Sequence, residues 1–121
     1  MPANQLMPAN DRISIELGED GIAQVRFTRG DKMNALDPEM FASIIEAGTV
    51  LEQAAGLRVV VLSGEGRAFC AGLDTASFGR TPSADEPDLT ERTYGNSNKF
   101  QQVAMLWRKL QVPVIAALHG V

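Results

Sequence analysis

The stretch "LRVVVLSGEGRAFCAGLD", residues 57–74, joins the most apolar run of this 121-residue chain to a loop of small residues. Residues 57–63 are mostly apolar at consecutive positions, a pattern typical of an interior strand in a largely parallel sheet. The loop after them is rich in glycine and alanine and ends in Leu73 and Asp74. Small residues let a ligand or another backbone come close to the main chain. The stretch therefore predicts a buried strand that leads into a binding loop.

Three further segments have the patterns of strands. Residues 12–17 and 23–28 alternate apolar and polar side chains, and the glycine-containing turn at 18–21 predicts that these two strands form a hairpin. Residues 114–118 form a second apolar run, which predicts another buried strand. With two helices between them, the strands give the order β-β-α-β-α-β, which indicates an α/β protein.

Two helices are expected between the strands. Asp37 and Pro38 predict the start of the first, because aspartate caps free amides and proline suits the first helical position. Gly56 predicts its end. Asp88-Leu-Thr-Glu91 resembles a capping box before a second helical pattern at 100–110. The first helix is expected to bury one face, formed by Phe41, Ile44, Ile45, Gly48, Leu51 and Ala55.

Composition restricts the class of protein. A chain of this length forms one domain at most. Its residues are 45% hydrophobic and 21% charged, which is typical of a soluble globular protein. A formal net charge of −4 argues against a nucleic-acid partner, and no apolar run reaches the ~18–20 residues that span a bilayer. The single cysteine cannot form a disulfide within the chain, which suits the reducing cytoplasm.

The two ends of the chain differ from the region between them. Residues 1–11 repeat Met-Pro-Ala-Asn at 1–4 and 7–10, and we expect them to be a disordered leader with a second possible start at Met7. At the other end, His119-Gly-Val follows the last predicted strand immediately. We therefore expect the fold to be truncated there, after the fourth predicted strand.

Three alternative sites can be weighed against simpler roles. Gly64-Glu-Gly66 invites comparison with a dinucleotide-binding loop, but Phe69 stands where that pattern needs its third glycine. Cys70 could be a nucleophile only with a nearby base, so a packed thiol is the preferred interpretation. His119, the only histidine, cannot build a metal site with one cysteine, and we expect backbone to satisfy it at a strand end. No metal is expected.

Backbone chemistry remains at Ala71-Gly72-Leu73. If this turn leads into a short helix at Asp74, the Leu73 amide points outward at the positive end of that helix. Such an amide is a ready donor to an oxyanion. The small neighbours Ala71 and Gly72 would let a carbonyl group reach it.

Three motifs together carry a resemblance to a known family. "RVVVLSGEGRAFCAGLD" at 58–74 closely resembles the signature of the crotonase superfamily, the enoyl-CoA hydratases and isomerases. "DKMNALD" at 31–37 and "PVIAALHGV" at 113–121 resemble two further segments of that family, in its order and spacing. The resemblance covers residues 12–121 and implies the N-terminal portion of a crotonase-like spiral of ββα units. It also implies assembly into trimers or hexamers.

The resemblance implies a role for each matching position. The Leu73 N–H would be the first oxyanion-hole donor, holding a thioester oxygen as it becomes an enolate. The backbone of Ala71 and Leu73, with Gly72 between them, would hold the adenine end of coenzyme A. Asp74 would either contact substrate or cap the next helix. The coenzyme A channel would be bordered by Lys32, which is a partner for a phosphate, and by Met33, Ala35 and Leu36.

The implied function is that of an acyl-CoA-binding enzyme of the hydratase/isomerase type in fatty acid metabolism. The coenzyme A thioester is the substrate, and no separate cofactor is expected. In the family, the second oxyanion amide and the acid/base carboxylates lie beyond the position of Val121. We therefore expect the 121-residue chain alone to be inactive. The alternative is a non-catalytic fragment or assembly module that keeps the ββα core.

Overall fold

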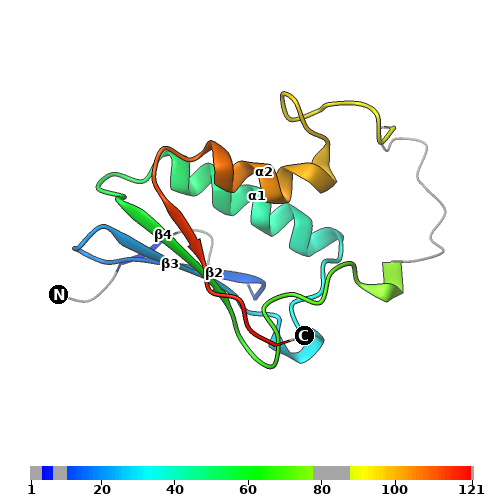
Figure 1. Ribbon diagram of the computed structural model, residues 1–121, viewed down its shortest axis with the longest axis horizontal. Coiled ribbons are helices and arrows are strands. Elements are labelled where there is room, and N and C mark those ends of the chain that lie inside the picture. Colours follow the sequence, from blue (N-terminus) through cyan, green and yellow to red (C-terminus); the bar gives the residue numbers. More distant parts are fainter. Residues whose placement is uncertain (1–3, 7–10, 78–87, 121) are drawn as a thin grey trace.

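The computed structural model describes residues 4–6, 11–77 and 88–120, which form one sheet with two helices stacked on one of its faces (Figure 1). Helix α1 (Pro38–Glu52) lies between the sheet and helix α2 (Lys99–Lys109). Two short 3-10 turns, η1 (Gly30–Lys32) and η2 (Thr75–Ser77), follow strands β3 and β4 along the chain. The strands are β1 (Asn4–Leu6), β2 (Ile13–Leu17), β3 (Ile22–Phe27), β4 (Val59–Gly64) and β5 (Val114–Ala116).

The sheet has the strand order β1-β2-β3-β4-β5. Strands β1, β2 and β3 pair antiparallel, whereas β3, β4 and β5 pair parallel. In the β3–β4 pair, Ile22 lies opposite Val59 and Phe27 lies opposite Gly64. The carboxyl ends of these two strands therefore lie side by side. The loops that leave them start from the same edge of the sheet.

The predicted strands are confirmed, with two corrections. Residues 1–11 were expected to be a disordered leader, which is wrong for Asn4–Leu6, because these residues pair with β2 as strand β1. The rest of that leader, apart from Asp11, lies outside the described residues. Residues 114–118 were expected to form a buried strand, but Ile115 is 57% exposed and Leu118 is 72% exposed. Strand β5 is the last in the sheet order, and no further strand covers it among the described residues.

Helix α1 begins where the sequence predicts. The Asp37 side chain accepts a hydrogen bond from the Met40 N–H at 2.8 Å, and Pro38 is the first helical residue. The predicted end at Gly56 is wrong, because the helix stops at Glu52 and Gly56 adopts a φ of +81° in the connection to β4. The predicted buried face is correct at Phe41, Ile44, Gly48 and Leu51, whereas Ala55 lies beyond the helix and is exposed.

Helix α2 begins at Lys99, next to the helical pattern predicted at 100–110, but its cap is not the one predicted at Asp88. The capping box is formed by Asn98 and Gln101, whose side chains bond reciprocally to each other's backbone N–H groups at 2.9 Å. The predicted capping residue Asp88 instead closes a turn, with its carboxylate accepting from both the backbone N–H and the hydroxyl of Thr90. An aspartate followed by polar residues is compatible with both a helix cap and a turn. The sequence pattern at Asp88 therefore did not distinguish the two.

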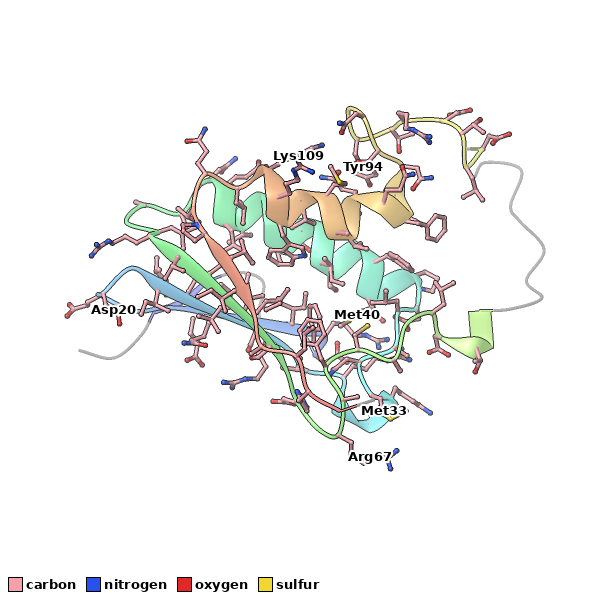
Figure 2. All side chains as sticks on the ribbon, in the orientation of Figure 1. Asp20, Met33, Met40, Arg67, Tyr94 and Lys109 are labelled. Carbon is pink, nitrogen blue, oxygen red and sulfur yellow. The ribbon has the colours of Figure 1, made fainter. Side chains whose placement is uncertain are left out.

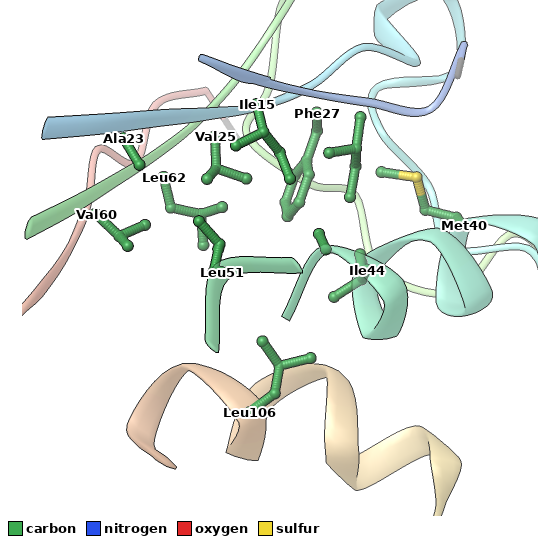
Figure 3. Close-up of a cluster of buried hydrophobic side chains, with 12 residues drawn as sticks. Ile15, Ala23, Val25, Phe27, Met40, Ile44, Leu51, Val60, Leu62 and Leu106 are labelled. Atoms are coloured by element: carbon green, nitrogen blue, oxygen red, sulfur yellow. The ribbon is translucent and has the colours of Figure 1, made fainter. Parts of the chain in front are cut away.

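The core fills the space between the sheet and α1 and reaches α2 through Leu106 (Figure 3). Gly48 makes this second contact possible, since a Cβ atom there would lie 2.8 Å from the Leu106 Cδ1 atom. The buried cluster consists of Ile13, Ile15, Ala23, Val25, Phe27, Met40, Ile44, Ala47, Leu51, Val60, Leu62 and Leu106. This packing fixes β3 and β4, and with them the loops at their carboxyl ends.

Candidate functional site

Two loops meet at the carboxyl ends of β3 and β4: the β3 loop, residues 28–36, and the β4 loop, residues 65–74. Three backbone hydrogen bonds join them. The Ala71 N–H donates to the Met33 carbonyl at 2.9 Å, the Leu36 N–H to the Gly72 carbonyl at 2.7 Å, and the Asp74 N–H to the Leu36 carbonyl at 2.9 Å. Segments that are far apart in the sequence thus form a short parallel pair. All eight predicted site residues lie on these two loops.

The Leu73 amide points away from the β3 loop. In a parallel bridge, one residue uses its own N–H and C=O to bond the two neighbours of its partner. Here Leu36 does so toward Gly72 and Asp74, so the N–H and C=O of Leu73 face the opposite side. Within the described part of the chain, the Leu73 N–H has no hydrogen-bond partner, and the Leu73 side chain is 52% exposed. The loop therefore presents an unpaired donor at the surface.

The backbone of both loops contains left-handed residues. Gly72 has a φ of +95°, and a Cβ atom added there would meet no heavy atom within 4 Å. Glycine at position 72 is thus required by conformation rather than by contact, and the space beside it is open. Met33 and Asn34 also have positive φ values, 50° and 56°. Two consecutive non-glycine residues in this region are uncommon and persist only where surrounding contacts hold them.

Asp74 is held at both carboxylate oxygens. Its Oδ1 atom accepts from the Ala76 N–H at 2.9 Å, and its Oδ2 atom lies 2.9 Å from the Arg29 Nη1 atom. The Ala76 hydrogen bond and then the Arg29 contact lower the pKa of Asp74 below its usual value, and the positive charge of Lys32 adds to the effect. Of the two roles left open by the sequence, capping is present, because Asp74 closes the turn that becomes η2. That element is a single 3-10 turn, too short for a substantial helix dipole.

Arg29, which sequence reasoning missed, links the two loops to helix α1. Besides Asp74, its guanidinium donates to the Ala35 carbonyl at 2.7 Å and lies 3.4 Å from the Asp37 carboxylate. The Arg12 guanidinium contacts the same carboxylate at 3.0 Å. Asp37 therefore caps α1 and also joins two arginines. The only local signal for Arg29 was a basic residue directly after a strand, which is too common to mark a site.

Two other basic side chains, Lys32 and Arg67, lie at the outer edge of the site. Lys32 is exposed in η1, and Arg67 donates to the Met33 sulfur at 3.4 Å. Figure 2 shows Met33 and Arg67 at the same end of the molecule. Ala35, by contrast, is only 9% exposed, and its carbonyl is occupied by Arg29. Ala35 therefore supports the β3 loop from inside, whereas Lys32 faces solvent.

The alternative sites have simpler structures. The His119 Nε2 atom lies 2.8 Å from the Gly66 carbonyl, which confirms a strand-end histidine satisfied by backbone. The dinucleotide interpretation is wrong, because in the described chain the first element after Gly66 is the three-residue η2 rather than a helix. Cys70 is half-buried, and its thiol donates to the Asn34 carbonyl at 3.3 Å, as a packed thiol does.

Two general features concern the whole described chain, residues 4–6, 11–77 and 88–120. Neither helix of this part of the chain has the length and apolar character needed to cross a membrane. In the same residues, no three histidine, cysteine, aspartate or glutamate side chains come together as a metal site would require.

Residues 18–121 match the family described as Enoyl-CoA hydratase/isomerase. The chain belongs to this family. A probable enoyl-CoA hydratase of Mycobacterium bovis is 33% identical over 110 residues, which are 89% of this chain and 38% of that protein. The hydroxycinnamoyl-CoA hydratase-lyase of Pseudomonas fluorescens is 32% identical over 111 residues, with the same coverage of each chain.

The family's fold is confirmed as well. The crystal structure of an enoyl-CoA hydratase from Mycobacterium smegmatis superposes with a TM-score of 0.73 at 30% identity. The match covers 92% of this chain and 41% of that one. The predicted crotonase-like α/β architecture is therefore correct. The chain spans 38% of the length of the two enoyl-CoA hydratase-type relatives named above.

Proposed function

We propose that the paired loops bind the thioester of an acyl-CoA and that the Leu73 N–H donates a hydrogen bond to its oxygen. In an enzyme of the hydratase/isomerase type, this donor stabilises the negative charge that develops as the thioester becomes an enolate. The observation that carries the proposal is the direction of the Leu73 amide. This N–H has no hydrogen-bond partner among the described residues, and it faces away from the β3 loop.

Coenzyme A binding is supported by what surrounds that donor. Lys32 is exposed and close enough for its charge to act on Asp74, so it can pair with a phosphate of the ligand. Met33 is half-buried at the same edge. The N–H of Ala71 is occupied by Met33, so the backbone groups that Ala71 and Leu73 can offer the adenine are their carbonyls. No separate cofactor is needed, because the thioester is itself the substrate.

Asp74 is assigned a positioning role in this proposal. Both of its oxygens are engaged, and its lowered pKa keeps it ionised and a weak base. Proton transfer in hydration or isomerisation would therefore come from other carboxylates of the enzyme. The same observation favours one alternative, a module that binds acyl-CoA without turning it over.

Leu73→Pro tests the proposal directly, because proline deletes the N–H while Leu73→Ala keeps it. The kinetics are measured on the full-length enzyme that carries these loops, because the 121-residue chain alone is expected to be inactive. Loss of one such donor is expected to lower its turnover of a short enoyl-CoA by about 10²–10³-fold, with Leu73→Ala close to the unmodified enzyme. Circular dichroism and coenzyme A binding must first show that the proline variant is folded. Cys70→Ser is the matched control in the same loop and should change turnover little.

Two results would overturn the assignment. Turnover could survive in folded Leu73→Pro, or Cys70→Ser could abolish it, which would return attention to the thiol. The 121-residue chain alone is expected to show no turnover in either case. If a full-length protein that carries these two loops and the acid/base carboxylates binds acyl-CoA but shows no turnover, the binding-module alternative is correct.

A further inference from the structure

Asn34 is a polar side chain buried between the two loops of the site, with an exposed fraction of 0%. Its Oδ1 atom accepts from the Arg29 N–H at 2.9 Å, within the β3 loop. Its Nδ2 atom donates to the carbonyls of Glu65 and Ala68, each at 3.0 Å, in the β4 loop. One end of the amide thus binds its own loop, and the other end binds the neighbouring loop twice.

The surroundings of Asn34 match a carboxamide and no other side chain of its size. One N–H and two carbonyls face it, and asparagine offers one accepting oxygen and one NH₂ group with two donors. Aspartate would place an oxygen against two carbonyls, and leucine would leave all three groups unpaired. Gly64 leaves the room that the amide needs, since a Cβ atom there would lie 2.7 Å from the Asn34 Nδ2 atom.

Asn34 also holds the backbone conformation that the loop pairing requires. Its φ of 56° is in the left-handed region, which asparagine tolerates better than most residues. The Cys70 thiol contacts its carbonyl from the β4 loop. The Met33–Ala71 and Leu36–Gly72 hydrogen bonds stand on either side of this position. Asn34 is therefore fixed from both loops in the middle of their pairing.

We propose that Asn34 is the positioning residue that holds the β3 and β4 loops in register and so sets the direction of the Leu73 N–H. Asn34 itself touches no reacting group. Its contacts with Glu65 and Ala68 fix the start of the β4 loop, and the pairing with Leu36 fixes its end. The role of the Leu73 donor toward a ligand rests on the function proposed above. The register of the two loops does not depend on that function.

Hydrogen exchange tests the proposal, read at single amides by mass spectrometry on the 121-residue chain. The amides of Leu36, Ala71 and Asp74 report the loop pairing, and amides of the β3–β4 ladder report the sheet. In Asn34→Gly, which suits the left-handed backbone and removes only the side chain, exchange at the three loop amides should rise by about tenfold or more. Exchange in the ladder should rise less.

Asn98→Ala is the matched control. Asn98 also bonds at both ends of its amide, accepting from Gln101 at 2.9 Å and donating to the Leu89 carbonyl at 2.8 Å, but it caps α2 away from the loops. Loss of the Asn98 side chain should lower the stability of the chain. It should not raise exchange at the three loop amides more than exchange elsewhere. A second variant, Asn34→Asp, keeps the acceptor for Arg29 and removes the donors to the β4 loop. It should reproduce the effect of Asn34→Gly.

Several outcomes would overturn the proposal. Exchange at the loop amides could be unchanged in Asn34→Gly, or it could rise only in step with the ladder. Complete unfolding of both Asn34 variants would also contradict it, because Asn34 would then stabilise the whole fold and not the loop register in particular. The proposed function can fail on its own. If the loop amides respond as expected but the unmodified chain binds no acyl-CoA, the role of Asn34 in the register is supported and the proposed ligand is wrong.

Discussion

Leu36 lies opposite Leu73 in a parallel bridge, and Leu36 makes both hydrogen bonds of that bridge. This asymmetry leaves the backbone of Leu73 available to another partner. The position of the bridge is set by Asn34 at one side and by Arg29 with Asp74 at the other. The geometry of the candidate site therefore depends on the hydrogen bonds and the ion pair that join the two loops. Several of the predictions below test these contacts.

Gly72→Val is expected to weaken acyl-CoA binding by about tenfold or more, equivalent to at least ~1.4 kcal/mol, because its side chain fills the open space beside Leu73. The positive φ also costs about 1–3 kcal/mol of stability. Gly56→Val is the matched control, since Gly56 has a φ of +81° and equally open surroundings but lies between α1 and β4. Both variants should lose similar stability, and only Gly72→Val should lose affinity in calorimetric titration. Equal affinities would remove the binding groove from this loop.

Asp74→Asn is expected to reduce the acid sensitivity of the fold. The pKa of Asp74 is lowered in the folded chain, so ionised Asp74 stabilises the fold above its unfolded pKa of about 3.9. That contribution is lost as the pH falls through the lower folded value. Unfolding followed from neutral pH to below about pH 4 should therefore show a shallower acid decline in the variant than in the unmodified chain.

Asp88→Asn provides the comparison for this experiment. The pKa of Asp88 is also lowered, first by the Thr90 backbone hydrogen bond, but Asp88 does not contact the site. It should flatten the acid decline as well, yet leave acyl-CoA affinity unchanged, whereas Asp74→Asn should lower that affinity by loosening the β4 loop. A decline in Asp74→Asn that runs parallel to that of the unmodified chain would contradict the assigned contacts.

Asp37 combines a helix cap with two ion pairs, and two substitutions separate these roles. Asp37→Ala removes both and is expected to cost about 1–2 kcal/mol for the cap alone. Asp37→Asn keeps an oxygen for the Met40 N–H but loses the charge shared by Arg12 and Arg29. Denaturant unfolding should therefore place Asp37→Asn between Asp37→Ala and the unmodified chain. If the two variants are equally unstable, the ion pairs dominate and the cap contributes little.

Self-association is expected through β5. An exposed strand edge recruits other chains. Ile115 in β5 is 57% exposed, and Leu118, just beyond the end of the strand, is 72% exposed. Ile115→Lys should shift the chain toward monomer in sedimentation velocity measured over a range of concentrations. Leu89→Lys changes an equally exposed side chain that lies outside the sheet, and it should leave association unchanged. A monomer at every concentration of the unmodified chain would contradict this prediction.

Local signals in the sequence predicted the elements whose causes are local. Alternation placed β2 and β3, and Asp37-Pro38 placed the start of α1, because capping acts within one turn. Burial of β5 was predicted wrongly, since an apolar run does not reveal whether a neighbour covers it. The Asp88 signal failed because a turn satisfies the same side chain as a helix cap.

The resemblance named Leu73 and the residues around it as site residues, and the structure brings them together on two paired loops. The contacts that hold these loops together were not predicted. Asn34 and Arg29 were missed, because their partners lie on other segments; Asn34 is separated by 31 and 34 positions from Glu65 and Ala68. No periodicity or spacing in the sequence encodes such contacts. They follow only from the parallel register of β3 and β4.

The same register has a consequence for the order of folding. Parallel strands cannot be joined by a tight turn, so the chain must pass through α1 before β3 and β4 can pair. Closing such a long connection is slow compared with forming a hairpin or a helix. A chain that has formed only the β2–β3 hairpin and α1 holds Met33 and Leu36 without partners. The Leu73 amide therefore acquires its direction late, after the crossover has closed.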